Sequence, residues 1–206
     1  DAFEAMLPGE NERARRYQLK GEVRVLDSVT APLLGGVAPE RALNLGYFDG
    51  RLAAMRERPE AAVAPLAGEV TDLARYRRVR ATGLPLPPHP PPTWRSLVGD
   101  LESLLHHVRP DVVVTPHPLI DDHPDHQMTT LALAEAARHT GARLTVYLYA
   151  NHVHGDHHPY GPQGSATTVP SCGTRVPFAT GLVSYDVDPL LRAKKLLAVE
   201  WMHDLR

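Results

Sequence analysis

The richest cluster of side chains that could do metal or acid–base chemistry falls within ten consecutive residues: His117, Asp121, Asp122, His123, Asp125 and His126. A catalytic zinc ion typically takes three protein ligands and keeps an open position for a water molecule, which it activates near neutral pH. Two histidines and a carboxylate would suit such an ion, and a second, unligated imidazole could stabilise an oxyanion or protonate a leaving amine. The same residues also suit a solvated loop whose aspartates cap a helix, and the spacing alone leaves both interpretations open.

The elements on either side of this stretch must position it. Residues 111–115 form a β-branched run that predicts a buried strand. Pro124 predicts a helix that starts there and ends near Thr140, with His123 as its N-cap. Since His126 follows His123 by three residues, both rings are expected to face one point at the carboxyl edge of a sheet.

Helices and strands are predicted to alternate along most of the chain. The further predicted elements are helices at residues 11–34, at 93–108 and from Pro189 onward, and strands at residues 42–45 and 144–149. This order favours an α/β fold, a three-layer Rossmann-like arrangement with a mainly parallel sheet, in which ligands bind at the carboxyl ends of strands. We expect residues 1–206 to form one domain, with the proline-rich end of residues 58–92 as a connector.

The run at residues 109–115, followed by His123-Pro124-Asp125-His126, resembles the PIG-L (LmbE-like) family of zinc-dependent N-acetylglucosaminide deacetylases. The resemblance implies a hydrolase that removes an N-acetyl group from an amino sugar or glycoconjugate by metal-activated water. It also implies that His126 ligates Zn²⁺ or another divalent metal. His123 would act on the transition state, with Asp125 as its neighbouring support.

Three further residues are predicted to bind the substrate. The turn at residues 46–50 resembles a sugar-holding turn of the same family, which assigns that role to Asp49. Asn151 and His152 follow the predicted strand at residues 144–149, where they could hydrogen-bond a sugar hydroxyl or a carbonyl oxygen. A surface loop rich in neutral histidine is the alternative for this second histidine cluster, which continues through His154, His157 and His158.

One departure from the family pattern leaves other functions open. The family's amino-terminal Ala-His-Pro-Asp-Asp-Glu loop, which supplies the other metal ligands and the general base, has no match in this chain, which begins at Asp1. We therefore expect a domain that is incomplete at its amino terminus, with enzyme activity conditional on those ligands. The alternatives are a non-catalytic carbohydrate-binding or regulatory domain that has lost the metal loop, and another metallohydrolase with a local triad of His117, Asp122 and His126.

Composition narrows the range of partners. The chain has 22 basic and 24 acidic residues, a net charge of −2, so no global field attracts nucleic acid or an anionic membrane. No apolar stretch approaches the ~20 residues of a transmembrane segment, and the single Cys172 excludes an internal disulfide. We expect a small-molecule or glycoconjugate substrate and no nucleic acid; the cytoplasm is the favoured compartment, and the oligomeric state stays open.

Overall fold

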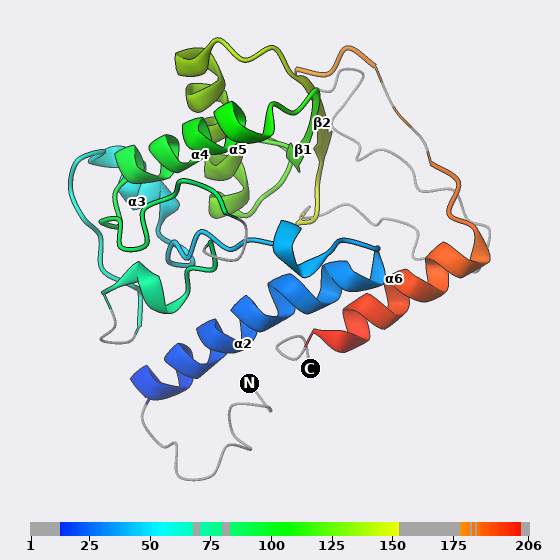
Figure 1. Ribbon diagram of the computed structural model, residues 1–206, viewed down its shortest axis with the longest axis horizontal. Helices are drawn as coiled ribbons and strands as arrows, with labels where there is room; N and C mark the ends of the chain where they lie inside the picture. Colours follow the sequence, from blue (N-terminus) through cyan, green and yellow to red (C-terminus); the bar gives the residue numbers. More distant parts are fainter. Residues whose placement is uncertain are drawn as a thin grey trace.

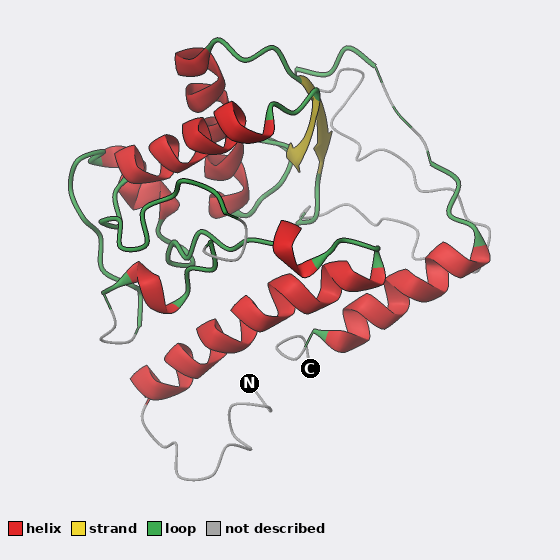
Figure 2. Ribbon diagram, in the orientation of Figure 1, coloured by secondary structure: helices red, strands yellow, loops and turns green. Residues whose placement is uncertain are grey.

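The structure is a computed structural model of the 206-residue chain, and it describes residues 13–67, 71–79, 83–152, 178–181, 183 and 185–202. Helices and strands are drawn in Figures 1 and 2. Their order is α2 (Arg13–Leu34), η1 (Pro39–Arg41), α3 (Leu52–Glu57), η2 (Leu73–Arg75), α4 (Trp94–Val108), β1 (Val112–Pro116), α5 (Pro124–Thr140), β2 (Thr145–Tyr149) and α6 (Pro189–Trp201).

A short parallel sheet provides the edge at which the chemistry-bearing residues gather. Strand β1 pairs in parallel with β2, with Val112 opposite Thr145 and Pro116 opposite Tyr149. Helix α5 connects the two strands, so the carboxyl ends of both meet at one edge of the sheet. The predicted α/β class and the parallel pairing are confirmed.

The hydrophobic core lies among α3, α4 and α5. It is built from ten buried side chains: Leu52, Met55, Val63, Trp94, Leu97, Val98, Leu105, Ala132, Leu133 and Ala136. The indole Nε1 of Trp94 donates to Glu135 at 3.0 Å, which gives this buried ring a polar partner across the α4–α5 interface. The second half of α5 is thereby part of a packed unit.

Local sequence signals set the helix ends correctly. The hydroxyl of Thr93 accepts from the backbone amide of Ser96 at the start of α4, and Asp188 caps α6 in the same way through Leu191. His123 is the N-cap of α5, and Gly141 ends that helix in the left-handed conformation with a φ of 68°. The predicted boundaries of α2, α4, α5 and α6 are confirmed to within about two residues, the usual uncertainty of helix ends.

The strand predicted at residues 42–45 is wrong. Asn44 makes only an isolated antiparallel bridge with Arg78. Its side-chain oxygen accepts from the backbone amide of Gly46 at 2.8 Å, which forms a local turn in place of a longer ladder. Gly46 has a φ of 78°, and a Cβ there would lie 2.9 Å from the backbone of Arg77 and of Leu73. Asp49 consequently follows a turn, and the expected strand end is absent at this position.

Strand β1 is only half covered, which corrects the prediction of a buried strand. Thr115 is buried and its hydroxyl lies 2.7 Å from the hydroxyl of Thr130 on α5. Val112 and Val114 are 48% and 64% exposed, because alternate residues of a strand point to opposite faces of the sheet. Within the described part of the chain, helices cover one face of the strand.

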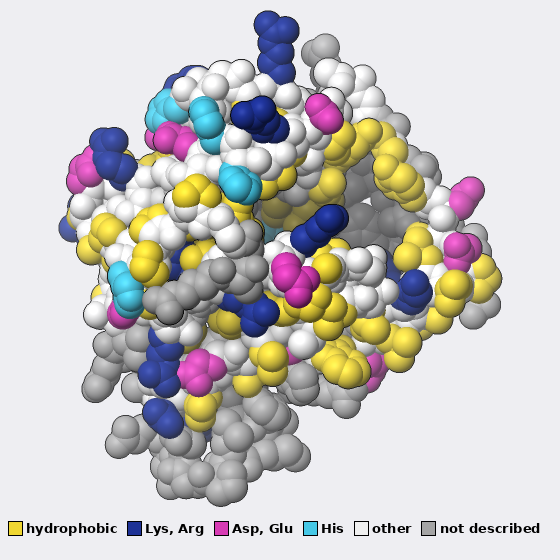
Figure 3. All heavy atoms as spheres, viewed as in Figure 1, with side chains coloured by type: hydrophobic (Ala, Val, Ile, Leu, Met, Phe, Trp, Pro, Cys, Tyr) yellow, Lys and Arg dark blue, Asp and Glu magenta, His cyan; other side chains and the backbone are white. Residues whose placement is uncertain are grey.

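Helices α2 and α6 lie side by side, apart from the α3–α4–α5 core (Figure 1). Of the apolar residues predicted to line α2, only Val29 is buried, while Leu26 and Leu33 are exposed. The side chains of Leu191, Leu196 and Val199 on α6 are exposed as well, and Figure 3 shows hydrophobic atoms along this helix. Within the described part of the chain, neither helix therefore buries a continuous apolar stripe. None of the described helices has both the length and the apolar character needed to cross a membrane.

A buried ion pair fixes the segment that leads to Asp49. Both guanidinium nitrogens at the tip of Arg77 donate to Asp100, at 2.7 and 2.8 Å, and the two side chains are 1% and 2% exposed. The hydroxyl of Tyr47 donates to the same carboxylate at 2.8 Å, and Arg77 also donates to the carbonyl of Leu45. Burial and the neighbouring charge of Asp100 raise the pKa of Tyr47. These contacts tie residues 45–47 to α4.

Asp100→Ala is expected to lower the free energy of unfolding by about 3–5 kcal/mol, because it leaves the guanidinium of Arg77 buried and unpaired. Urea unfolding followed by circular dichroism measures the change. Arg95→Met is the matched control, since the Arg95–Glu60 pair is 75% and 66% exposed and its loss is expected to leave the midpoint unchanged. Equal effects of the two substitutions would contradict a stabilising role for the buried pair.

Candidate functional site

The candidate site is built around the first turn of α5. Pro124 occupies the first helical position, and His123 precedes it as the N-cap. The Nδ1 atom of His123 accepts from the backbone amide of Asp125 at 3.2 Å, a cap usually made by an oxygen. The cap holds the His123 ring at the start of the helix, where His126 lies one turn further on.

Three imidazole rings come together at the carboxyl edge of the sheet. The ring centroids of His123 and His126 are 4.7 Å apart. His152, which follows β2, lies 5.3 Å from His123 and 5.0 Å from His126 by the same measure. The structure thus brings His123 and His126 close together, and the second histidine cluster contributes a third ring.

A fully buried carboxylate, Asp121, connects these residues. Its Oδ1 accepts from the backbone amide of His123 at 3.0 Å, and its Oδ2 accepts from the backbone amide of Asn151 at 2.8 Å. The Oδ2 atom also lies 3.0 Å from Nδ1 of His126. Burial by itself would raise the pKa of Asp121, but the hydrogen bonds from Asn151, His126 and His123 outweigh it and lower the pKa to about 2. Asp121 is therefore ionised near neutral pH.

The hydrogen bonds place the proton of neutral His123 and the proton of neutral His126 on different ring nitrogens. An ionised carboxylate only accepts, so the Nδ1 atom of His126 must donate to Asp121, which leaves a lone pair on Nε2 of the neutral ring. In His123 the Nδ1 atom is the acceptor, so the neutral ring carries its proton on Nε2. One imidazole thus offers an electron pair and its neighbour offers an N–H group.

Asp125 links this helix start to the turn that contains Asp49. Its carboxylate accepts from the backbone amides of Gly50 and Leu52, the second at 3.1 Å, while its own backbone amide donates to Nδ1 of His123. Asp49 itself is exposed, and its carboxylate lies 3.3 Å from Arg24 of α2. The structure therefore brings the Asp49 turn against α5 through Asp125, with the Asp49 side chain directed toward Arg24.

Asn151 and His152 lie at the end of β2, as predicted, and their backbone amides face Asp121. The sequence pointed to Asp121 only as a member of the ligand cluster or as a helix-capping aspartate. Its position two residues before an N-cap histidine is a signal for a side chain that turns back to the backbone. His154, His157 and His158 lie outside the described residues.

Among the described residues, the side chains that could ligate a metal ion differ in how well they fit that role. No three His, Cys, Asp or Glu side chains among them come together as a site able to hold a metal ion. This rules out, for that part of the chain, the local triad of His117, Asp122 and His126. The Nδ1 atom of His117 instead accepts from the amides of Leu119 and Ile120 at 3.1 Å. His126 fits a metal-ligand role, because a carboxylate on one ring nitrogen is the usual partner of a histidine that binds a metal through the other.

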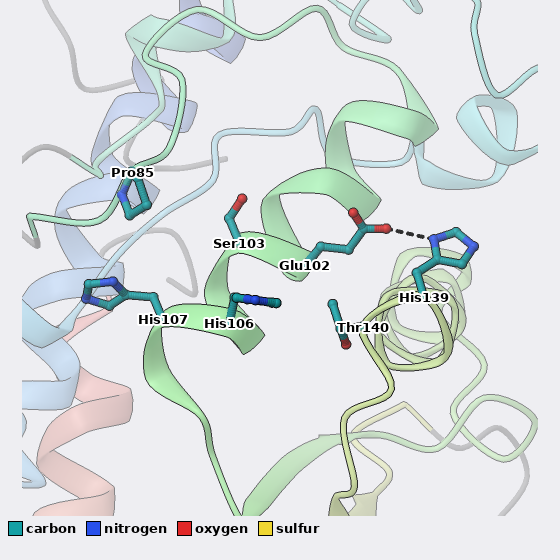
Figure 4. Close-up of a pocket in the computed structure, with 7 residues that line it drawn as sticks. All are labelled: Pro85, Glu102, Ser103, His106, His107, His139 and Thr140. Atoms are coloured by element: carbon teal, nitrogen blue, oxygen red, sulfur yellow. Dashed lines mark hydrogen bonds and ion pairs between the residues drawn. The ribbon is translucent and has the colours of Figure 1, made fainter.

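A second group of histidines is separate from this site. It lies in an open groove at the carboxyl ends of α4 and α5. There Nδ1 of His139 lies 2.7 Å from a carboxylate oxygen of Glu102 (Figure 4). The groove is lined by Pro85, Glu102, Ser103, His106, His107, His139 and Thr140. Since His126 and His139 stand near opposite ends of α5, about 20 Å of helix separates them.

Comparison with known families gives one match. The profile of the family described as PIG-L: GlcNAc-PI de-N-acetylase matches residues 9–137, which is more than half of the chain and includes Asp121, His123 and His126. Neither the curated proteins nor the solved structures contain a match to this chain.

Asp125→Ala is expected to speed hydrogen exchange at the amides of Gly50 and Leu52, because both lose their carboxylate acceptor. The helix cap made by His123 uses the backbone amide of residue 125 and should persist. Amide exchange measured by NMR tests this, with Asp122→Ala as the neighbouring control. Unchanged exchange at both amides in folded Asp125→Ala protein would show that the carboxylate does not hold the turn.

Proposed function

Since the chain belongs to the PIG-L family, we propose that it is a metal-dependent hydrolase that removes the N-acetyl group from an amino sugar or glycoconjugate. The proposed metal is Zn²⁺ or another divalent ion. His126 is the proposed metal ligand, and His123 is the proposed catalytic residue. Asp125 supports His123 through the cap at the start of α5.

The opposite proton positions of His123 and His126 carry this proposal. Hydrolysis of an amide needs a group that stabilises negative charge on the carbonyl oxygen, and an N–H donor at a fixed position serves that purpose. The Nδ1 atom of His123 accepts from the amide of Asp125, so the N–H group of the neutral ring is at Nε2. His126, with Nδ1 bound to Asp121, keeps a lone pair for a metal. The centroid separation of 4.7 Å supports the proposal that both rings act on one bound group.

A bound zinc ion would lower the pKa of water toward neutrality and polarise the carbonyl of the substrate. His126 would fill one of the protein ligand positions. The residues of the chain then orient the amide: His123 donates to the carbonyl oxygen as charge develops there, and the N-cap bond keeps its ring from turning away.

The substrate side of the proposal uses the residues around the three rings. His152 lies 5.0 Å from His126 between ring centroids and is exposed, so it can reach a sugar hydroxyl beside the acetamide. Asn151, on the same strand exit, is proposed to contribute its side-chain amide. Asp49 is proposed to bind a second hydroxyl from the turn that Asp125 ties to α5, in exchange for its exposed contact with Arg24.

We also propose that residues 1–206 form a single domain of the three-layer Rossmann-like type. The β1–α5–β2 unit with its parallel pairing supports this, because parallel strands joined by a helix are the building block of such folds. The uncovered Val112 and Val114 face is the side on which a further helical layer would pack.

The function is tested with the full-length protein, zinc and an N-acetylglucosaminide, with released acetate and bound metal both measured. His126→Ala is expected to lose stoichiometric zinc. His123→Ala is expected to keep zinc while its kcat falls about 10²–10³-fold, the usual cost of removing one oxyanion donor.

His139→Ala is the matched control, because it removes an exposed imidazole from the far end of the same helix. It should keep both zinc and turnover. Protein that is folded and zinc-loaded yet releases no acetate would end the hydrolase assignment, and sugar binding without turnover would favour a carbohydrate-binding domain. Loss of zinc in His123→Ala with retention in His126→Ala would reverse the two roles.

A further inference from the structure

We propose that Asp121 is the positioning residue of this site, which holds the proton of His126 on Nδ1 and so keeps Nε2 available as an electron-pair donor. The inference deepens the proposed function and rests on it for the identity of the group that His126 binds. Asp121 has no contact with a reacting atom, so its effect on chemistry passes through His126.

Both oxygens of the Asp121 carboxylate are engaged, and each by a different part of the chain. Oδ1 accepts from the amide of His123, which belongs to the start of α5. Oδ2 accepts from the amide of Asn151, which belongs to the exit of β2, and from Nδ1 of His126. Backbone donors from two separate elements therefore fix the position of the carboxylate independently of the His126 ring.

The backbone of Asp121 is held from both sides as well. Its carbonyl accepts from the side-chain amide of Gln127 at 2.7 Å, and its amide donates to the carbonyl of His117 at 3.3 Å. A substitution that keeps the shape of the side chain should therefore leave residue 121 in place. This makes Asp121→Asn an informative change, since asparagine has nearly the same size.

Asparagine cannot satisfy all four donors that face Asp121, which include the backbone amide of His152 at 3.5 Å. It has one oxygen and one NH₂ group in place of two oxygens. With its NH₂ group toward His126 and Asn151, it would donate to Nδ1 of His126 and move the ring proton to Nε2, which occupies the lone pair that a metal requires. With its NH₂ group toward His123, it would face the backbone amide there and oppose the first turn of α5. The proton position of His126 is thus expected to change in the first orientation, and helix capping in the second.

The first test needs no substitution. Long-range proton–nitrogen NMR spectra of metal-free wild-type protein report which nitrogen of each neutral histidine ring carries the proton. We expect His126 to be protonated on Nδ1. A His126 ring protonated mainly on Nε2 would overturn the proposal, whether or not any variant folds.

The second test compares zinc affinity, measured by competition titration, in wild type, Asp121→Asn and Asp111→Asn. Loss of a carboxylate behind a metal-binding histidine typically weakens metal binding about 10–100-fold, and we expect that change in Asp121→Asn, together with a larger Nε2–H fraction of His126. Asp111→Asn removes an exposed carboxylate just before β1 and is the matched control, with unchanged affinity expected. Unaltered zinc affinity in folded Asp121→Asn protein would overturn the positioning role, because the carboxylate charge behind His126 is lost in either orientation of the asparagine.

These outcomes are separate from those of the proposed function. An altered His126 ring and weaker zinc binding in Asp121→Asn support the positioning role even if the wild type releases no acetate. An active wild-type deacetylase whose Asp121→Asn variant keeps zinc affinity and ring state would uphold the function and remove Asp121 from it.

Discussion

The buried negative charge of Asp121 is the constraint around which the candidate site is arranged. An ionised carboxylate without exposure to solvent is costly unless several donors surround it. Four donors do so: the backbone amides of His123, of Asn151 and, at 3.5 Å, of His152, and the ring of His126. Because two of these come from different elements, the charge joins the start of α5 to the exit of β2. The cluster of imidazoles follows from this junction.

The fold makes that junction possible. Parallel pairing of β1 with β2 brings both strand exits to one edge, and α5 begins above that edge after a short loop. Helix α5 is held in turn by the core it shares with α3 and α4, and the Asp125 carboxylate ties its first turn to the segment before α3. Positions in the site therefore depend on packed elements, the arrangement that keeps catalytic groups in a fixed geometry.

Features governed by neighbours in the sequence could be predicted, and those governed by distant contacts could not. The cap at His123 and the end of α5 at Gly141 follow from local chemistry of proline and glycine. The role of Asp121 depends on Asn151, thirty residues away, which no local pattern contains. The strand predicted at residues 42–45 does not form, because the side chain of Asn44 accepts a hydrogen bond from the amide of Gly46. The β-branched run of β1 likewise predicted a strand, but composition does not tell how many of its faces are covered.

Membership of the PIG-L family and the hydrogen bonds of the paired imidazoles both support the proposed chemistry. The central claim is that the two rings of α5 divide their roles, with one for the metal and one for the carbonyl oxygen. A crystal structure of the full-length protein loaded with zinc tests it most directly. The account predicts zinc about 2.0–2.1 Å from Nε2 of His126, with His123 outside the coordination sphere. Zinc bound by His123 without His126, or held only in the groove near His139, would contradict it.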